Sequence, residues 1–329
     1  MKDLRIEQFT EKDIYGTIEL LQNVFHKQEY FRIQRDIAWW EWKYQKNVFG
    51  KPIIFLAKTN KGDIVGSRIF WPWNLQFQGR TFKAFQPVDT SILPEFRGAG
   101  LFRKMTEMAL TEAQKQKTDI LFNFPNSQSL PGDLKMGWRY VSKIPWQIKP
   151  LKPLATLRSF FNRDQARPVE LEQVYELKEK HCRELPDTET PDGLLRTKVS
   201  PEFVKWRYLD HPFFRYGFHS FSSGNKWMSG IFSVVQKGCR KEMYLVDLFG
   251  HPECLSSFLR ELTEIARSLD VAFIAAIQTT GYGMENLWKV GFLKYRRKNM
   301  VALAFNTHFE ERTKKLNNWK LVGGMHDTL

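Results

Sequence analysis

Five short motifs occur twice in this 329-residue chain, in the same order along the sequence. In the clearest pair, Trp42 and Tyr44 correspond to Trp206 and Tyr208, which follow 164 residues later. The other four pairs are Gly66 with Gly230, Val88-Asp89 with Val246-Asp247 (each followed by Pro-Glu), residues 119–124 with 270–275, and residues 136–140 with 290–295. Self-similarity of this kind is the sequence signature of a duplicated folding unit. The chain is therefore expected to form two related domains.

A stretch rich in proline and basic residues separates the two copies. Residues 143–168 contain four prolines, six Lys or Arg residues and one Asp, a composition typical of a linker or a long crossover. We expect a first domain over residues 1–148, a linker or crossover over 149–168, a second domain over 169–310 and a C-terminal tail over 311–329.

Hydrophobic periodicity in the first copy predicts helices that alternate with strands. Apolar residues at helical spacing predict helices over residues 10–25, 31–44 and 101–117. Three runs of β-forming residues between positions 51 and 93 are joined by tight turns, which predicts an antiparallel meander. The next strand, over residues 119–124, should run parallel to its predecessor because a helical crossover precedes it. The fold class is therefore α+β (α/β), with a mixed, mainly antiparallel sheet, one parallel strand pair and flanking helices in each copy.

Charge and cysteine content narrow the possible partners. The formal net charge of +14 favours an anionic partner, but no Lys/Arg block of the nucleic-acid-binding type is present, so no DNA partner is expected. Cys182, Cys239 and Cys254 contain no CxxC pair, which argues against a disulfide framework and a metal site. No apolar run reaches the roughly 18 residues of a membrane span, and the charged N-terminus lacks a signal-peptide core, which predicts a cytoplasmic protein.

A glycine-bearing turn directly precedes the helix predicted after the meander. Its sequence is Arg97-Gly98-Ala99-Gly100. The first N–H groups of a helix lack intrahelical partners and lie at the positive end of the helix dipole, and glycine allows a phosphate to approach the backbone closely. The pattern lacks the glycine spacing of a Walker loop or a dinucleotide fingerprint. By itself it is compatible with a phosphate site and with a simple tight turn.

In its context this stretch resembles the GNAT superfamily of acyltransferases, which bind acetyl-CoA. The family signature, (Gln/Arg)-x-x-Gly-x-(Gly/Ala), is matched from Arg97 to Phe102, with Phe102 departing from the last position. The resemblance implies that acetyl-CoA, or another acyl-CoA, is the co-substrate and that a backbone segment pairs with its pantetheine arm. The residues carried over are Thr90, Ser91 and Ile92 for the arm, Arg97, Gly98, Ala99, Gly100, Leu101, Phe102 and Arg103 for the pyrophosphate, and Asn126 for a further contact with the arm.

The family resemblance leaves the proton-transferring groups open. The position of the usual general acid, a Tyr in the family, is held by Asp133, which is a candidate acid only if burial raises its pKa. Asp89 and Glu41 are candidate general bases, but Asp89 is repeated as Asp247, which favours a structural role.

The second copy is expected not to bind CoA. An alignment without gaps places Ser256 and Phe258 opposite Gly98 and Gly100, and a Phe there would block a phosphate. Known GNAT proteins include tandem arrangements with one active and one degenerate half, and this chain looks similar.

Three unrepeated tryptophans, Trp39, Trp71 and Trp73, are candidates for acceptor binding because their faces stack well on sugars. We expect an N-acyltransferase, most simply an N-acetyltransferase, that acts on a small-molecule amine such as an amino sugar or a nucleotide-linked sugar. The alternatives are an aminoacyltransferase resembling the Fem-type enzymes, which use aminoacyl-tRNA, and a non-catalytic CoA-binding protein.

Overall fold

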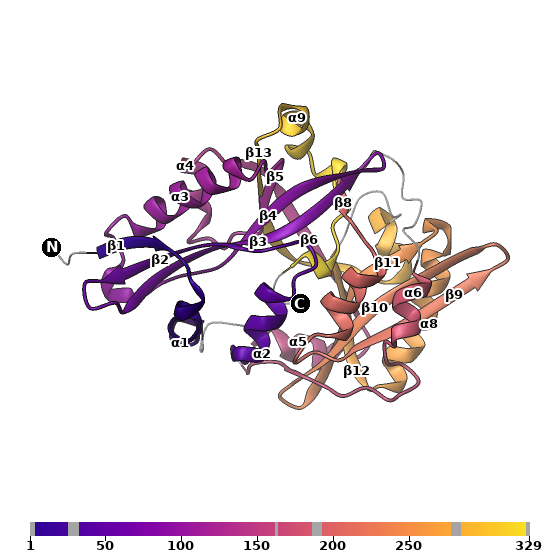
Figure 1. Cartoon of the computed structure of the whole chain (residues 1–329). Coiled ribbons are helices and arrows are strands. Elements are labelled where there is room, and N and C mark those ends of the chain that lie inside the picture. Colours follow the sequence, from indigo (N-terminus) through magenta and orange to yellow (C-terminus); the bar gives the residue numbers. More distant parts are fainter. Residues whose placement is uncertain (1–3, 26–32, 162–163, 186–192, 278–283, 327–329) are drawn as a thin grey trace.

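The computed structural model describes residues 4–25, 33–161, 164–185, 193–277 and 284–326. In this part of the chain, thirteen strands form one continuous sheet, and helices cover both of its faces (Figure 1). The main path through the sheet has the order β1-β2-β3-β4-β5-β13-β6-β12-β11-β10-β7, with β8 beside β3 and β9 beside β10.

The first copy forms one end of the sheet. Its strands are β1 (Leu4–Gln8), β2 (Ile53–Thr59), β3 (Ile64–Phe77), β4 (Arg80–Ile92), β5 (Ile120–Asn123) and β6 (Arg139–Pro150), and its helices are α1 (Ile14–Phe25), α2 (Ile37–Trp40), α3 (Leu101–Lys115) and α4 (Leu130–Lys135). The predicted meander is present, because β2, β3 and β4 pair antiparallel, and β5 runs parallel to β4 as predicted. Strand β1 was missed because its alternation of apolar and charged residues extends over only Leu4 to Glu7.

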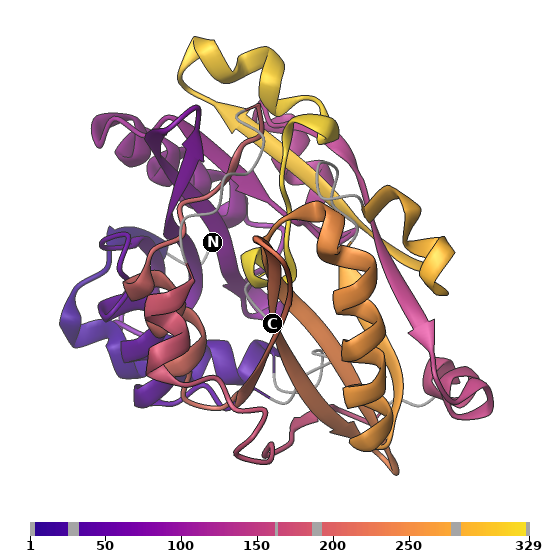
Figure 2. The ribbon, with the colours of Figure 1, turned by 90° about the vertical axis from the view of Figure 1, so that its right-hand side faces the viewer.

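The second copy repeats this arrangement. Its strands are β7 (Arg167–Pro168), β8 (Arg196–Thr197), β9 (Tyr216–Ser223), β10 (Lys226–Lys237), β11 (Arg240–Gly250), β12 (Val271–Ile277) and β13 (Leu293–Ala304), and its helices are α5 (Pro153–Phe161), α6 (Glu179–Glu184), α7 (Pro201–Val204), α8 (Leu255–Ser268) and α9 (Glu310–Thr313). Strands β9, β10 and β11 pair antiparallel, and β11 pairs parallel with β12. Figure 2 shows α8 lying across the strands of this half. The predicted mixed, mainly antiparallel sheet with one parallel pair per copy is confirmed.

The two copies exchange their last strands. β13 of the second copy pairs with β5 of the first, and β6 of the first pairs with β12 of the second. β6 and β13 also pair with each other, antiparallel, from Arg139 with Ala302 to Ile148 with Leu293. The predicted boundary at residue 148 therefore falls within β6, a strand of the first copy that pairs with strands of the second.

The interface between the copies contains a nearly symmetric pair of indoles. Residues Glu41–Gln45 and Lys205–Leu209 each form a single turn of π-helix. The Nε1 of Trp42 donates a hydrogen bond to the carbonyl of Trp206 (2.6 Å), and the Nε1 of Trp206 donates one to the carbonyl of Trp42 (2.7 Å). The two rings stack with their centroids 5.9 Å apart. The repeat seen in the sequence thus becomes a pseudo-twofold contact in the fold.

The C-terminal segment, predicted as a tail over residues 311–329, packs into the fold over its described part. Trp319, Leu321 and Met325 are fully buried, and the segment up to His326 lies between the two copies (Figures 1 and 2). The Arg207 guanidinium donates to the carbonyls of Gly324 and His326, each at 3.0 Å. The C-terminal segment therefore packs against the interface between the copies.

Replacing one indole should weaken the interface between the copies. Trp206→Phe removes the donor of a buried hydrogen bond and part of a buried ring, so we expect the free energy of unfolding to fall by about 1–3 kcal/mol or more. Urea unfolding measures this loss. Trp288→Phe is the matched control, because Trp288 is 66% exposed, and it should change the free energy by about 0.5 kcal/mol or less. Equal losses in the two variants would show that the indole pair contributes nothing specific.

Candidate functional site

A cleft can form in each copy where its two parallel strands diverge. β4 pairs with β5 only at Ala84–Ile120 and Phe85–Leu121, and the rest of β4 continues without β5 beside it. The pairing of β4 with β3 is interrupted by a bulge at Asp89 and Thr90, which together face Arg68. This bulge turns the backbone of β4 at the point where the parallel pair ends.

The predicted phosphate loop lies at the end of β4. The chain leaves the strand at Ile92, makes a short 3₁₀ turn at Pro94–Phe96, and passes through Arg97–Gly100 into the 15-residue helix α3. Gly98 and Gly100 have φ angles of +82° and +73°, which L residues rarely adopt. A Cβ on either glycine would meet no atom within 4 Å. The glycines are therefore required by the backbone conformation, and the exposed loop leaves open space above the N-terminus of α3.

The second copy lacks this loop altogether. Its 3₁₀ turn at Pro252–Cys254 continues directly into α8 at Leu255, so the four residues that match Arg97–Gly100 are missing. Ser256 and Phe258 lie within α8, and the gapless alignment that placed them opposite Gly98 and Gly100 is corrected. The Phe258 ring packs so closely on Gly230 that a Cβ there would lie 2.4 Å from it.

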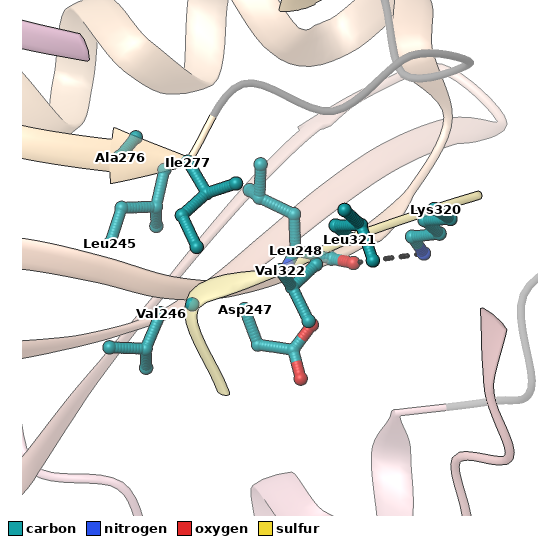
Figure 3. Close-up of a pocket in the computed structure, with 10 residues that line it drawn as sticks. Leu245, Val246, Asp247, Leu248, Ala276, Ile277, Lys320, Leu321 and Val322 are labelled. Atoms are coloured by element: carbon teal, nitrogen blue, oxygen red, sulfur yellow. Dashed lines mark hydrogen bonds between the residues drawn. The ribbon is translucent and has the colours of Figure 1, made fainter. Parts of the chain in front are cut away.

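The cleft of the second copy is filled by the C-terminal segment (Figure 3). Lys320 donates to the carbonyl of Leu248 at 3.3 Å, and a Cβ on Gly323 would lie 3.1 Å from Val246. A Cβ on Gly324 would lie 1.9 Å from the hydroxyl of Tyr208. The cavity that remains between β11, β12 and this segment is about 10 Å³, the space of about one water molecule. A pantetheine arm has no room there.

The filled cleft contains a buried carboxylate, Asp247. It accepts hydrogen bonds from the Tyr208 hydroxyl at 2.7 Å and from the Leu248 amide at 2.9 Å. Burial raises its pKa from 3.8 to about 6, and the nearby Lys320 charge partly offsets this rise.

This carboxyl should make the stability depend on pH. Between pH 4 and pH 6 the folded protein keeps a proton on Asp247 that the unfolded chain has released, so stability falls as the pH rises through this window, by about 3 kcal/mol in total. Asp247→Asn should remove this dependence. Urea unfolding of both proteins from pH 4 to pH 7 measures it, and parallel profiles would contradict the assignment.

Asp89, the predicted base, is buried in the first copy and contacts two cations and a hydroxyl. Its carboxylate contacts the Lys43 ammonium, accepts from the Tyr44 hydroxyl at 2.5 Å and lies 3.6 Å from the Arg35 guanidinium. The second copy has no phosphate loop, yet its Tyr208 and Asp247 form the same bond. This bond therefore joins the π-helical turn to the bulged strand in both copies, and a structural role fits Asp89 better than proton transfer. Glu41, the other candidate base, pairs with Lys46 at the surface.

Asp133, the predicted acid, is completely buried between α4 and the sheet. Its carboxylate lies 3.4 Å from the Arg68 guanidinium and accepts from the Asn123 amide at 3.0 Å. Burial raises its pKa, and Arg68 counteracts that rise. Arg68 also donates to the Thr90 hydroxyl at 2.6 Å, and its guanidinium lies 4.9 Å from the centre of the Phe102 ring. The buried Arg68 of β3 thus contacts β4, α3 and α4 through Thr90, Phe102 and Asp133.

Removing one member of this ion pair should cost more stability than removing both. Arg68→Met leaves a buried carboxylate without its cation, and we expect a loss of about 3–5 kcal/mol. The double variant Arg68→Met/Asp133→Leu leaves no buried charge and should recover much of that loss. Urea unfolding of the two single variants and the double variant completes the thermodynamic cycle. Strictly additive losses would contradict a direct interaction between the two side chains.

The other residues assigned to CoA lie around the same cleft. Thr90, Ser91 and Ile92 form the end of β4, and the Ser91 hydroxyl bonds to that of Ser67 at 2.8 Å. Arg97 and Ala99 are exposed, whereas Leu101 packs into the core. Arg103 pairs with Glu107 at 2.7 Å. Asn126 is exposed, and its carbonyl oxygen accepts from the Gln128 and Ser129 amides, so it caps the turn before α4. The structure brings these residues to one end of the sheet.

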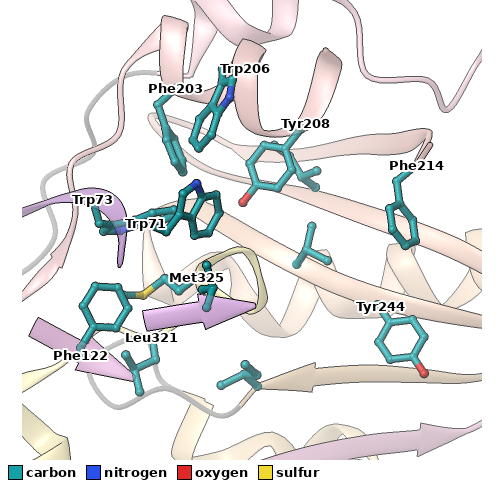
Figure 4. Close-up of a cluster of buried hydrophobic side chains, with 14 of the residues drawn as sticks. Trp71, Trp73, Phe122, Phe203, Trp206, Tyr208, Phe214, Tyr244, Leu321 and Met325 are labelled. Atoms are coloured by element: carbon teal, nitrogen blue, oxygen red, sulfur yellow. The ribbon is translucent and has the colours of Figure 1, made fainter. Parts of the chain in front are cut away.

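The three predicted acceptor tryptophans are in the core, which corrects that prediction. Trp39 is 2% exposed, and Trp71 and Trp73 are inaccessible. Figure 4 shows Trp71 and Trp73 beside Phe203 and Trp206 of the second copy. The Trp73 indole donates to the Thr197 hydroxyl at 3.0 Å, a contact between the copies. Trp71 and Trp73 fill the interface with the second copy, whereas Trp39 packs edge-on against Tyr44 of the first.

Residues 5–141 match the family model described as the acetyltransferase (GNAT) domain. This part of the chain is a GNAT domain. The matched residues form the end of the sheet that carries the loop Arg97–Gly100. No curated protein sequence matches the chain.

Solved structures resemble nearly the whole chain in fold. A GCN5-related N-acetyltransferase from Anabaena variabilis has 14% identity and a TM-score of 0.63 over 91% of this chain and 72% of its own. A probable N-acyltransferase from Enterococcus faecalis has 11% identity and a TM-score of 0.64, over 92% and 73%. N-myristoyltransferase from Saccharomyces cerevisiae, with bound myristoyl-CoA, has 10% identity and a TM-score of 0.61, over 92% and 83%. The likeness extends beyond the matched GNAT domain into the second copy.

Two features of the GNAT domain's surroundings had no usable signal in the sequence. Arg68 lies in an apolar strand, where a lone charge predicts a surface residue, and its partner Asp133 is 65 residues away. The Val322-Gly323-Gly324-Met325 segment has the composition of a loop, although each glycine fits against the second copy.

Within the described residues, no helix is long and apolar enough to span a membrane.

Proposed function

We propose that the chain is an acyl-CoA-dependent N-acyltransferase that moves an acyl group from CoA to the amine of a small molecule. The observation that carries this proposal is the loop Arg97–Gly100, which presents its backbone at the N-terminus of α3, next to the diverging strands β4 and β5. A pyrophosphate would meet the unpaired first-turn amides and the Arg97 charge there. The GNAT match and the myristoyl-CoA bound to the yeast neighbour support an acyl-CoA as donor.

The reaction needs an unprotonated amine, a polarised carbonyl and a departing thiolate. The amine nitrogen attacks the thioester carbon, a C–N bond forms, the C–S bond breaks, and the amine proton is transferred to solvent while the thiolate is protonated. The backbone amides near the β4 bulge, from Val88 to Thr90, are the donors that we propose to polarise the carbonyl. Both predicted carboxylates are engaged in buried ion pairs. We therefore propose that protons move through water rather than through Asp89 or Asp133.

The acyl group is proposed to be acetyl, with longer chains as the alternative. The acceptor is proposed to be an amino sugar or a nucleotide-linked sugar in the cytoplasm. An aminoacyl-tRNA donor is disfavoured, because the loop Arg97–Gly100, which we propose to bind the pyrophosphate of CoA, is present.

Calorimetric titration with acetyl-CoA and myristoyl-CoA tests the donor. We expect one site per chain, since the second copy has neither the loop nor an empty cleft. Gly100→Glu places a carboxylate in the anion site and should weaken binding at least tenfold. Gly79→Glu is the matched control, because Gly79 has a φ of +70° and equally open surroundings but lies in the turn between β3 and β4.

The outcomes separate the candidate functions. No heat with either thioester would reject the proposal, and so would equal weakening by the two glycine variants. Binding followed by thiol release in the presence of amines identifies a transferase. Binding without thiol release across a broad amine panel identifies a non-catalytic CoA-binding protein instead.

A further inference from the structure

A second cavity lies between the two copies, away from the phosphate loop. It has a volume of about 380 Å³, within the range of small-molecule sites. Gln34, just before α2, lines it from the first copy, and Arg167, Glu170, Phe213 and Arg215 line it from the second. Sites of this size frequently lie where two domains meet.

The walls of this cavity are anchored to the core of the interface. The residue after Gln34 is Arg35, whose guanidinium lies 3.6 Å from the Asp89 carboxylate at the β4 bulge. On the other wall, the Phe213 amide donates to the Nδ1 of His211 at 3.1 Å, and the His211 ring lies 4.1 Å from that of Trp42. Both walls of the cavity therefore contact the interface between the copies, one through Asp89 at the β4 bulge and the other through Trp42.

The cavity and the helix α3 lie on opposite faces of the sheet. α3 packs on one face of the first sheet through Leu101 and Met105, whereas α1 and α2 pack on the other through Leu21 and Trp39. The phosphate loop opens beside α3, and Gln34 belongs to the connection between α1 and α2. A ligand in the cavity would therefore not compete with the pyrophosphate.

The chemistry of the lining favours an acidic ligand. Arg167 and Arg215 are exposed, and neither forms an ion pair within the described residues. The Arg215 guanidinium makes one long contact, at 3.4 Å, with the His211 carbonyl. The lining residues include one carboxylate, that of Glu170, and two guanidiniums, which gives the lining a net positive charge. Guanidinium groups bind carboxylate and phosphate through paired hydrogen bonds, and the Phe213 ring adds apolar surface.

We propose that this cavity binds an acidic group of the amine acceptor, a phosphate or a carboxylate, held by Arg167 and Arg215. This inference rests on the proposed function and specifies its substrate class: the acceptor is an amine that carries an anionic group at some distance from the nitrogen. It also gives the second copy a role, since that copy supplies both arginines although its own cleft is filled.

Binding measurements without acyl-CoA test the cavity independently of catalysis. Matched probe pairs share their amine and differ in the acidic group: glucosamine 6-phosphate against glucosamine, and β-alanine against propylamine. We expect at least one acidic probe to bind the full-length protein tenfold or more tightly than its neutral partner. Arg215→Ala and Arg167→Ala should each weaken that probe about tenfold, and Arg215→Lys less than Arg215→Ala. Arg260→Ala makes the same charge change on the exposed surface of α8 and should leave the affinity unchanged.

Each result decides the proposal. Equal affinity within both probe pairs overturns it, and so does equal weakening by Arg260→Ala, which would reveal attraction to the net charge alone. Acidic probes that bind through Arg167 and Arg215, in a protein that fails to bind acyl-CoA, would support the cavity and reject the proposed function. Acyl-CoA binding without selectivity for acidic probes would support the proposed function and reject the cavity as an acceptor site.

Discussion

Two hydrogen bonds that cross between Trp42 and Trp206 hold the centre of this molecule together. Each indole donates to the backbone of the other, so each π-helical turn is fixed relative to its counterpart. Those turns also carry Tyr44 and Tyr208, whose hydroxyls bind the carboxylates at the diverging strands. The exchange of β6 and β13 makes the sheet continuous across the same contact. The position of each cleft therefore depends on the interface between the copies and not on one copy alone.

The two copies share an arrangement of strands but differ where their parallel strands diverge. The first keeps a four-residue loop with two glycines in a left-handed conformation, and its strand β4 continues beyond its short pairing with β5. The second runs straight from its 3₁₀ turn into α8, and its cleft holds the C-terminal segment. These two changes reinforce each other, because a cleft without a phosphate site gains stability when an apolar segment fills it. The positive φ angles alone explain why residues 98 and 100 are glycines. The proposed phosphate site therefore rests on the whole loop and its position before α3.

Much of this arrangement could be predicted from short-range patterns. The meander, the helix α3 and the parallel strand β5 all follow from periodicity and turns, and the repeat anticipates the pairing of Trp42 with Trp206. Contacts between distant segments could not be predicted in this way. Periodicity describes which face of a strand is apolar but not which strand lies beside it, so the exchange of β6 and β13 left no trace in the pattern. Trp71 and Trp73 look like binding residues when only one copy is considered, and they become core residues once Phe203 and Trp206 of the other copy cover them.

The buried charges suggest how the site separates structure from chemistry. Asp89 and Asp133 each lie against cations within the protein, so their negative charges are already compensated where the thioester would bind. A carboxylate in such a pair connects the elements that carry the two charges. Its value lies in fixing the strand, the loop helix and the following helix at defined positions, which is what binding a long, flexible donor requires. The groups that contact substrates are then expected among the backbone amides at the bulge and the exposed arginines of the interface, outside the ion pairs that hold the cleft in shape.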